Sequence, residues 1–349
     1  MSTCVKKSTE TWNDMQDYYK NVLEGSIRFG SDVCSLKATQ MMTKGAKNAL
    51  SLVHGDIKER YFGCGLPLPS CLLEAHVLDL GCGTGRDVYL LSKMVGPNGH
   101  VTGIDMTDEL LSFAKKYVDY HCQAFGYNES NVDFKEGYIE KLSASGIKAN
   151  QFDVIVSNCV INLSPDKRSV LKEAYTSLKD GGEIFFSDMY ANKPIPDTLK
   201  TNKSLWGDGL AGALTWSQLL EIAEEVGFTR PRLYAIRKIN VNKPEYKELV
   251  GDIQYASITC RLFKLPPEAS GKSTESEVKF NGTEDHLDKL VFDNSVTFTT
   301  GTRTVVDGNL AAILKYSRYA KHFSFTSLST EAPPHQNDIS DPFGLLSCK

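Results

Sequence analysis

The chain lacks any segment that stays apolar over the length needed to cross a bilayer, which is about eighteen residues. Its first ten residues contain no apolar core of a secretory signal peptide. An excess of basic charge is also missing. With 39 Lys and Arg against 43 Asp and Glu, the net charge is −4, which argues against a general binder of phosphate backbones. We therefore expect a cytosolic protein that binds neither membranes nor nucleic acids.

Patterns typical of structural metal sites are missing as well. Nine cysteines occur in 349 residues, but the sequence has no Cys-x-x-Cys pair and no Cys/His spacing of a zinc site. The seven histidines form no spaced pair. The chain is also not a small, cysteine-dense scaffold of the secreted kind. Most of the cysteines are therefore expected to be small buried residues, and each exception has to be argued separately.

A strand, a glycine loop and a helix are predicted in succession. The apolar run 75–80 is followed by Gly81, Gly83 and Gly85 at every second position, and residues 87–95 have helical spacing. Glycines let the backbone approach a ligand, and the helix N-terminus carries partial positive charge. The spacing differs from the Gly-x-Gly-x-x-Gly of dinucleotide-binding proteins. The pattern predicts a nucleotide-binding corner of another kind.

Two acids accompany this loop. Asp79 lies two residues before Gly81 and is placed to hold an ammonium group. Asp105 ends the second predicted strand, where an acid can bond both ribose hydroxyls of an adenosine, and Met106 follows it. This arrangement resembles the class I S-adenosylmethionine (SAM) methyltransferases. The resemblance implies that the loop after the third strand, with Ile139 and Glu140, meets the adenine, and that Asn158 also contacts the cofactor.

Strands and helices alternate from residue 75 to residue 190, which predicts an α/β, Rossmann-like fold with a parallel sheet covered on both faces. The predicted strands are 75–80, 100–104, 131–135, 152–157 and 182–188, and the predicted helices are 87–95, 107–126, 166–179 and part of 137–149. Further helices are expected at 12–23, 37–52 and 216–226, and a further strand at 255–265.

The domain organisation follows from these elements and from composition. We expect an N-terminal helical region at 1–72 with Cys34 and Cys64, a SAM-binding domain at 73–190, a cap with following strands at 191–265, a small β-containing domain at 266–329 that begins with a flexible loop to residue 277, and a mobile tail at 330–349.

Three cysteines differ from the others in their surroundings. Cys34 is in a polar loop, Cys64 stands between two glycines in a turn, and Cys159 follows the fourth strand, where ligands of open α/β sheets bind. The alternative interpretation of Cys159 is a small apolar core residue. Considered together, the three thiols suggest a soft ligand, and trivalent arsenic is such a centre.

Around these cysteines the sequence resembles the arsenic(III) methyltransferases of animals and algae. The resemblance runs from about Cys34 to Phe343, and it is carried by Tyr61-Phe62-Gly63-Cys64-Gly65-Leu66, Ser157-Asn158-Cys159-Val160-Ile161-Asn162-Leu163, Trp206-Gly207 and Ala311-Ala312-Ile313-Leu314-Lys315-Tyr316-Ser317-Arg318. It implies three arsenic-binding thiolates, two of which match Cys64 and Cys159. The third position is occupied by Gly209.

The resemblance also implies a reaction. The methyl group of SAM would pass to the lone pair of arsenic, in a detoxifying reaction that leaves S-adenosylhomocysteine. Cys34 and Cys64 would supply electrons and form a disulfide, which thioredoxin or glutathione would reduce. Tyr61, Phe62 and Trp206 could line the site and face the sulfonium, or they could equally be aromatic residues of the core. We expect a monomer.

Gly209 leaves several alternatives open. Two thiolates could still bind arsenic that already carries a methyl group, or arsenite with one oxygen ligand retained, and the substrate range could have narrowed. Cys34 could also supply the third ligand, or activity could have been lost. Two other functions compete with arsenic methylation: a SAM-dependent methyltransferase for another small acceptor, in which the cysteines are merely inherited, and a thiol-based metalloid binder without turnover.

Overall fold

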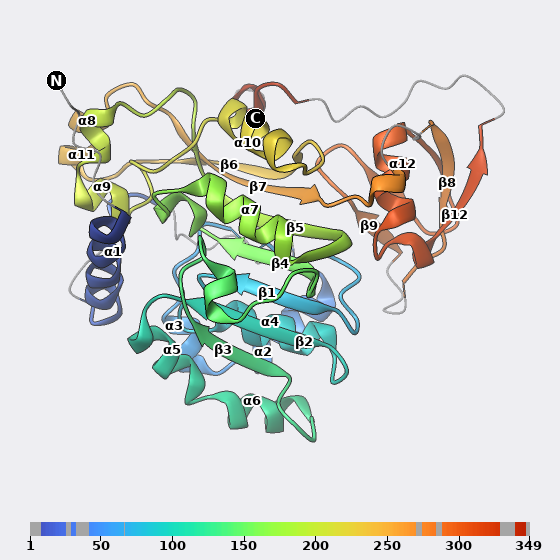
Figure 1. The fold of residues 1–349 in the computed structure, drawn as a ribbon, viewed down its shortest axis with the longest axis horizontal. Coiled ribbons are helices and arrows are strands. Elements are labelled where there is room, and N and C mark those ends of the chain that lie inside the picture. Colours follow the sequence, from blue (N-terminus) through green and yellow to red (C-terminus); the bar gives the residue numbers. More distant parts are fainter. Residues whose placement is uncertain are drawn as a thin grey trace.

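The computed structural model describes residues 8–25, 29–32, 42–65, 67–269, 274–283, 288–328 and 339–346. A seven-stranded sheet in the order β3-β2-β1-β4-β5-β7-β6 forms its centre (Figure 1). Strands β1 to β5 are parallel, and β7 is antiparallel to both β5 and β6. The strands are β1 (His76–Leu80), β2 (His100–Asp105), β3 (Val132–Glu136), β4 (Phe152–Asn158), β5 (Leu178–Ala191), β6 (Arg232–Ile239) and β7 (Tyr255–Phe263). The predicted α/β fold with a parallel sheet is confirmed.

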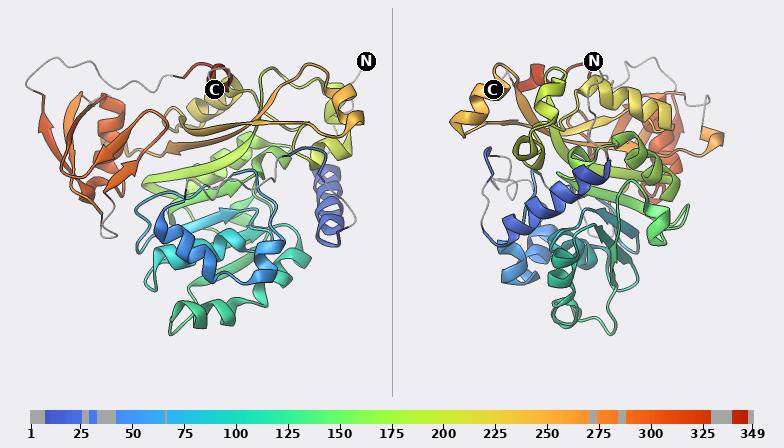
Figure 2. Two further views of the ribbon diagram at one scale, coloured as in Figure 1. Left: turned by 180° about the vertical axis from the view of Figure 1, so that it is seen from behind. Right: turned by 60° about the vertical axis from the view of Figure 1, so that its left-hand side comes forward.

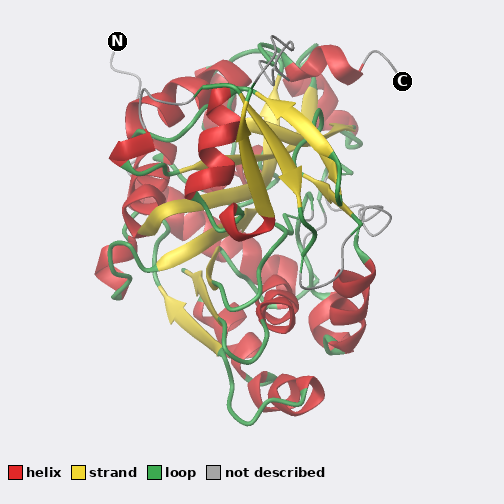
Figure 3. Cartoon of the chain, turned by 90° about the vertical axis from the view of Figure 1, so that its right-hand side faces the viewer, coloured by secondary structure: helices red, strands yellow, loops and turns green. Residues whose placement is uncertain are grey.

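Helices cover both faces of this sheet (Figure 3). One layer contains α2 (Lys44–Leu52), α4 (Arg86–Val95), α5 (Asp108–Lys115) and α6 (Val118–Phe125), and the other contains α7 (Lys167–Ser177) and α10 (Trp216–Val226). Successive residues of a strand point to opposite faces. Val77 of β1 accordingly packs in the first layer, and Leu78 packs in the second. A strand buried on both faces needs this continuous apolar run.

Five further helices of the described residues precede the C-terminal unit. They are α1 (Ser8–Leu23), α3 (Gly55–Glu59), α8 (Asp197–Lys200), α9 (Lys203–Gly207) and α11 (Pro244–Val250). Ile57 of α3 packs in the first layer. Figure 2 shows α1 at the end of the molecule opposite the C-terminal unit. It packs beside α9, and the Tyr18 hydroxyl donates a hydrogen bond to Asp208 there. No helix of the described residues is long and apolar enough to span a membrane.

The C-terminal unit has its own small core of buried aromatic and aliphatic residues. Strands β11 (Arg303–Val306), β8 (Ser276–Phe280) and β12 (Phe323–Ser327) form one sheet, β9 (Lys289–Val291) pairs with β10 (Thr297–Thr299), and α12 (Gly308–Tyr316) packs beside them.

Several predicted boundaries differ from the structure. The helix predicted at 107–126 is broken into α5 and α6, and residues 137–149 contain only a short 3₁₀ turn, Leu142–Ser145. The sheet is larger than predicted, because β6 and β7 extend it beyond residue 190. The loop predicted to reach residue 277 ends earlier, since β8 begins at Ser276.

The expected mobile tail is wrong for residues 339–346. Phe343 is buried against the sheet domain, and the indole of Trp216 donates a hydrogen bond of 2.8 Å to the carbonyl oxygen of Ile339. Apolar side chains near the C-terminus therefore pack in the main core. The composition of this segment does not predict that packing.

A buried ionic network joins the sheet to the C-terminal unit. Glu183 of β5 is fully buried and pairs with Arg261 of β7 and with Arg318, which follows α12. Arg261 also donates to the carbonyl oxygen of Phe292 (2.9 Å) and to the hydroxyl of Tyr319 (2.7 Å). One buried cation and one largely buried cation therefore depend on one carboxylate.

Replacing Glu183 by alanine should lower the free energy of unfolding by about 3–5 kcal/mol, because the change leaves the guanidinium groups of Arg261 and Arg318 without their anion. Urea unfolding would measure the loss. The matched control is Arg303→Ala, which removes an exposed pair with Glu277 and should cost less than about 1 kcal/mol. Equal losses of unfolding free energy in the two variants would contradict the inference that the buried network stabilises the fold more than the exposed pair does.

Candidate active site

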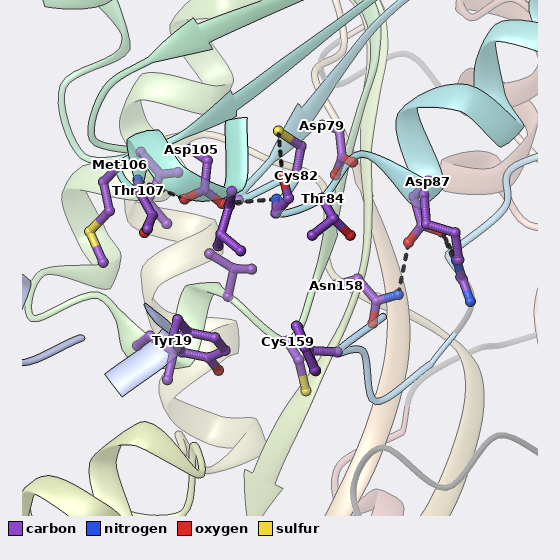
Figure 4. A pocket seen from close by; sticks show the side chains of 18 of the residues that line it. Tyr19, Asp79, Cys82, Thr84, Asp87, Asp105, Met106, Thr107, Asn158 and Cys159 are labelled. Carbon is purple, nitrogen blue, oxygen red and sulfur yellow. Dashed lines mark hydrogen bonds and ion pairs between the residues drawn. The ribbon is translucent and has the colours of Figure 1, made fainter. Parts of the chain in front are cut away.

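A cavity of about 930 Å³, counted with its open mouth, lies at the carboxyl ends of β1, β2 and β4 (Figure 4). Ligands of open α/β sheets bind at this edge. The structure brings together there nearly all of the residues predicted to contact a cofactor: Asp79, Gly81, Gly83, Asp105, Met106, Ile139, Glu140 and Asn158. Gly85 is not among the lining residues, and it caps the N-terminus of α4 instead.

The glycine loop needs glycine for two reasons. Gly81, Gly83 and Gly85 all have positive φ angles (67°, 53° and 84°), a region that other residues avoid. A Cβ on Gly81 would also collide with the side chain of Val160. The backbone of the loop can therefore approach a ligand closely. No side chain accepts a capping hydrogen bond from the first turn of α4.

Asp105 is fixed by the backbone that surrounds it. Its two carboxylate oxygens accept hydrogen bonds from the N–H groups of Gly83 and Thr107, both at 2.9 Å. Burial raises the pKa of Asp105, and these N–H groups oppose the rise. The carboxylate is thus held at the tip of β2, where it was predicted to meet a ribose.

Asp79 is buried on the cavity wall, and no residue of the described chain donates a hydrogen bond to its carboxylate. Burial raises its pKa well above the ordinary value, and the neighbouring carboxylates of Asp87 and Asp105 raise it further. A buried carboxylate in this situation favours a cationic partner. An ammonium group of a ligand would satisfy it.

The N-terminal helix contributes residues that the sequence did not single out. Trp12 and Tyr19 of α1 line the cavity. The indole of Trp12 donates to the carboxylate of Glu140 (3.1 Å), and its ring lies 4.4 Å from that of Tyr138. Helical periodicity predicted α1, but no local pattern shows that a helix 70 residues before the loop closes over the same cavity.

The thiols of Cys64 and Cys159 meet beside the cavity. They form a disulfide in the structure, and their Cα atoms are 5.6 Å apart. Cys159 lines the cavity wall and has a φ of 60°, which costs a residue other than glycine about 1 kcal/mol. Such strain is typical of functional positions. Cys34 lies outside the described residues.

The side chain of Asn158 holds the Cys64 turn against the sheet. Its amide oxygen accepts hydrogen bonds from the N–H groups of Cys64 (3.1 Å) and Gly65 (3.2 Å), while its amide nitrogen donates to Asp87 (3.1 Å). Asp87 in turn pairs with Arg86, whose guanidinium lies 3.2 Å from the ring centre of Tyr61. The cysteine turn and the glycine-loop helix are therefore one connected unit.

Polar side chains of β5 surround the two sulfur atoms. The hydroxyl of Ser187 lies 3.7 Å from the sulfur of Cys64. A carboxylate oxygen of Asp188 and the sulfurs of Cys64 and Cys159 all lie within 4.8 Å of one another. Burial raises the pKa of Asp188 to about 7, and burial lowers the pKa of Lys167, its nearest basic neighbour, to about 8. No sequence pattern pointed to Asp188 as a site residue.

Gly209 and Trp206 lie on the same side as the cysteines. Gly209 has a φ of 79°, and a Cβ placed there would lie 3.2 Å from the terminal methyl group of Met189, which shares a core cluster with Cys64. Trp206 was predicted to line the site with Tyr61 and Phe62. Tyr61 and Phe62 do so, whereas the indole of Trp206 donates to the carbonyl oxygen of Leu163.

The fold and the cavity define the class of protein, a class I SAM-dependent methyltransferase. A profile of a methyltransferase domain matches residues 74–227, and a profile of the arsenite methyltransferase C-terminal domain matches residues 273–349.

Comparison with individual proteins narrows the class. Mouse arsenite methyltransferase is 42% identical over 349 residues, covering 97% of this chain and 92% of its own. The enzyme of Aquipseudomonas alcaligenes is 42% identical over 334 residues, covering 95% and 92%. The crystal structure of an arsenic(III) SAM methyltransferase from Chlamydomonas reinhardtii superposes with a TM-score of 0.78 at 37% identity, covering 84% of this chain and 99% of that one. The chain belongs to the arsenite methyltransferase family.

Asp79→Asn and Asp105→Asn should each weaken SAM binding by about tenfold to a hundredfold, since a hydrogen bond to a charged group contributes about 1.5–3 kcal/mol. Isothermal titration calorimetry on the reduced protein would measure the change. Asp133→Asn, an exposed carboxylate of β3, is the matched control and should bind SAM normally. Unchanged affinity in both site variants would disprove the assigned cofactor contacts.

Proposed function

We propose that this chain transfers the methyl group of SAM to trivalent arsenic held by the thiolates of Cys64 and Cys159. The observation that carries the proposal is the meeting of these two sulfurs at the wall of the cofactor cavity. Thiolates are the protein ligands that suit a soft centre. The names of the relatives, arsenite methyltransferases, agree with this chemistry.

Transfer requires alignment more than acid or base catalysis. The lone pair of arsenic attacks the methyl carbon, a carbon–arsenic bond forms, and the carbon–sulfur bond of SAM breaks to leave S-adenosylhomocysteine. Orientation of this kind can contribute about 7–11 kcal/mol. We assign the ammonium group of SAM to Asp79 and its ribose to Asp105, with Ile139 and Glu140 beside the adenine. Asn158 sets the position of Cys64 relative to that cofactor.

Electron balance brings in a thiol reductant. Arsenic that gives its lone pair to a methyl cation is formally oxidised by two electrons, and two thiols can return them by forming a disulfide. The Cys64–Cys159 disulfide shows a pair close enough to do so, and we keep Cys34 as a further candidate. We propose that thioredoxin or glutathione reduces the disulfide, because these systems keep thiols reduced in the cytosol. We also propose that the protein works there as a monomer.

Gly209 bears on the choice of arsenical. In the pattern of the family a cysteine stands at this position, and glycine offers no ligand atom. We propose that two thiolates bind the arsenic, and that its third ligand comes with the substrate. Inorganic arsenite would retain a hydroxyl group, and methylarsonous acid would retain its methyl group.

Cys159→Ser should lower the rate of methyl transfer from labelled SAM to arsenite by about a hundredfold or more, because the arsenic loses one of two ligands and its alignment. SAM binding should persist. The matched control is Cys122→Ser, a half-buried thiol on α6 outside the cavity, which should keep full activity. A fully active Cys159→Ser enzyme, or S-adenosylhomocysteine formed equally fast without arsenical, would point to another acceptor.

Arsenite should bind only after reduction, because a disulfide leaves neither sulfur available as a thiolate. Oxidised and reduced protein would be incubated with arsenite, desalted and assayed for bound arsenic, with peptide mass spectrometry of the Cys64–Cys159 link. About one arsenic per chain is expected after reduction, and none before it. Equal binding by both forms would show that these two thiols are not the ligands.

A further inference from the structure

The strongest unexplained group beside the two thiols is the carboxylate of Asp188. It lies near the end of β5 and is 2% exposed. A carboxylate oxygen lies within 4.8 Å of both sulfurs, and among the described residues these three side chains form the cluster with the spacing of a three-ligand site. The proposed function assigns roles to the thiols but none to Asp188.

The backbone holds this carboxylate in one orientation. One oxygen accepts a hydrogen bond from the N–H of Met189 (2.8 Å), and the other accepts from the N–H of Asn162 (2.9 Å). A carboxylate has about four acceptor positions, and the N–H groups that surround Asp188, with that of Ile161, occupy at most three of them. Asp188 is thus a fixed acceptor that can take one more hydrogen bond.

Arsenite bound by two cysteines supplies that donor. Arsenous acid has three hydroxyl groups, and exchange with two thiols releases two water molecules and leaves (Cys-S)₂As–OH. The remaining hydroxyl lies in a buried site, where an unpaired O–H is costly. Gly209 cannot replace this hydroxyl group as the third ligand of arsenic, because glycine has no side-chain ligand atom.

We propose that Asp188 is a positioning residue, an inference that rests on the proposed function. Its carboxylate accepts the hydrogen bond of the arsenic-bound hydroxyl group. This contact makes inorganic arsenite a substrate of a site with two thiolates. A thiol reductant first reduces the Cys64–Cys159 disulfide to two thiols and is itself oxidised to a disulfide. Methylarsonous acid keeps a methyl group in the third position, and that group gives Asp188 nothing to accept.

The arrangement also turns the arsenic in the correct direction. Cys159 lines the cofactor cavity, whereas Cys64 and Asp188 are not among its lining residues. A hydroxyl bound to Asp188 would therefore lie on the side of the arsenic away from the cavity wall. The lone pair of a three-coordinate arsenic points away from its ligands, and this arrangement would leave it on the cavity side.

The test compares two substrates in one variant. Asp188→Asn keeps the shape of the side chain but sets an amide N–H₂ against one of the two backbone donors, so the fixed acceptor is lost. The ratio of kcat/KM for arsenite to kcat/KM for methylarsonous acid should fall by about tenfold to a hundredfold, as expected for a hydrogen bond to a charged acceptor. A ratio equal to that of the original chain would overturn the proposal.

The matched control is Asp293→Asn. Asp293 is 1% exposed and accepts hydrogen bonds from the backbone N–H groups of Ser295 and Val296, both at 2.9 Å, but it belongs to the C-terminal unit. It also pairs with the buried guanidinium of Arg232 (2.7 Å), so its substitution is the more severe of the two for the fold. The loss of a buried, backbone-bonded carboxylate is therefore reproduced away from the thiols. The substrate ratio of this variant should equal that of the original chain, and a fall as large as that of Asp188→Asn would reduce Asp188 to a structural role.

A second measurement needs no variant and no turnover. X-ray absorption at the arsenic edge of the reduced original chain loaded with arsenite should show two As–S bonds and one As–O bond. Three As–S bonds would mean that another thiol, such as Cys34, fills the third position, and would overturn the proposal. If neither arsenical is methylated, the proposed function fails, while the As–O ligand and the weaker arsenite binding of Asp188→Asn still decide the role of Asp188.

Discussion

The hydrogen bonds of the Asn158 side chain are the constraint on which the rest of the site depends. They attach the turn that carries Cys64 to the end of β4 and, through Asp87, to the helix that follows the glycine loop. One amide therefore sets the distance between the thiol pair and the cofactor cavity. In-line transfer tolerates little displacement, so the proposed reaction would depend on this connection.

The sheet explains why the two halves of the site can face each other. The parallel strands β1, β2 and β4 end at one edge and carry Asp79, Asp105 and Asn158 to the cavity. In β5, Ser187 is paired with Asn158 at the end of β4, and Asp188 is the first residue beyond that edge, so both lie beside the sulfurs. The buried pairing of Glu183 with two arginines fastens the C-terminal unit to the same strand.

Local patterns account for the parts that could be predicted. The apolar run 75–80 predicts β1, the glycines at every second position after it predict the loop, and the acids at the strand ends follow from the spacing. Failures occurred where a distant segment decided the outcome. Phe343 packs in the same core as Trp216, more than a hundred residues away in the sequence. Trp206 bonds to a carbonyl oxygen instead of lining the cavity. The structure offers no such explanation for the break of the helix predicted at 107–126.

The sequence by itself determined the class of fold, the cofactor loop with Asp79 and Asp105, and the cysteine motifs that mark the family, because each of these is a short-range pattern. The tertiary structure alone decided which thiols meet, that α1 places Trp12 over the cavity, and that Asp188 lies within reach of both sulfurs. Contacts between residues 64, 159 and 188 depend on the order and length of strands in the sheet, and no local pattern encodes that order.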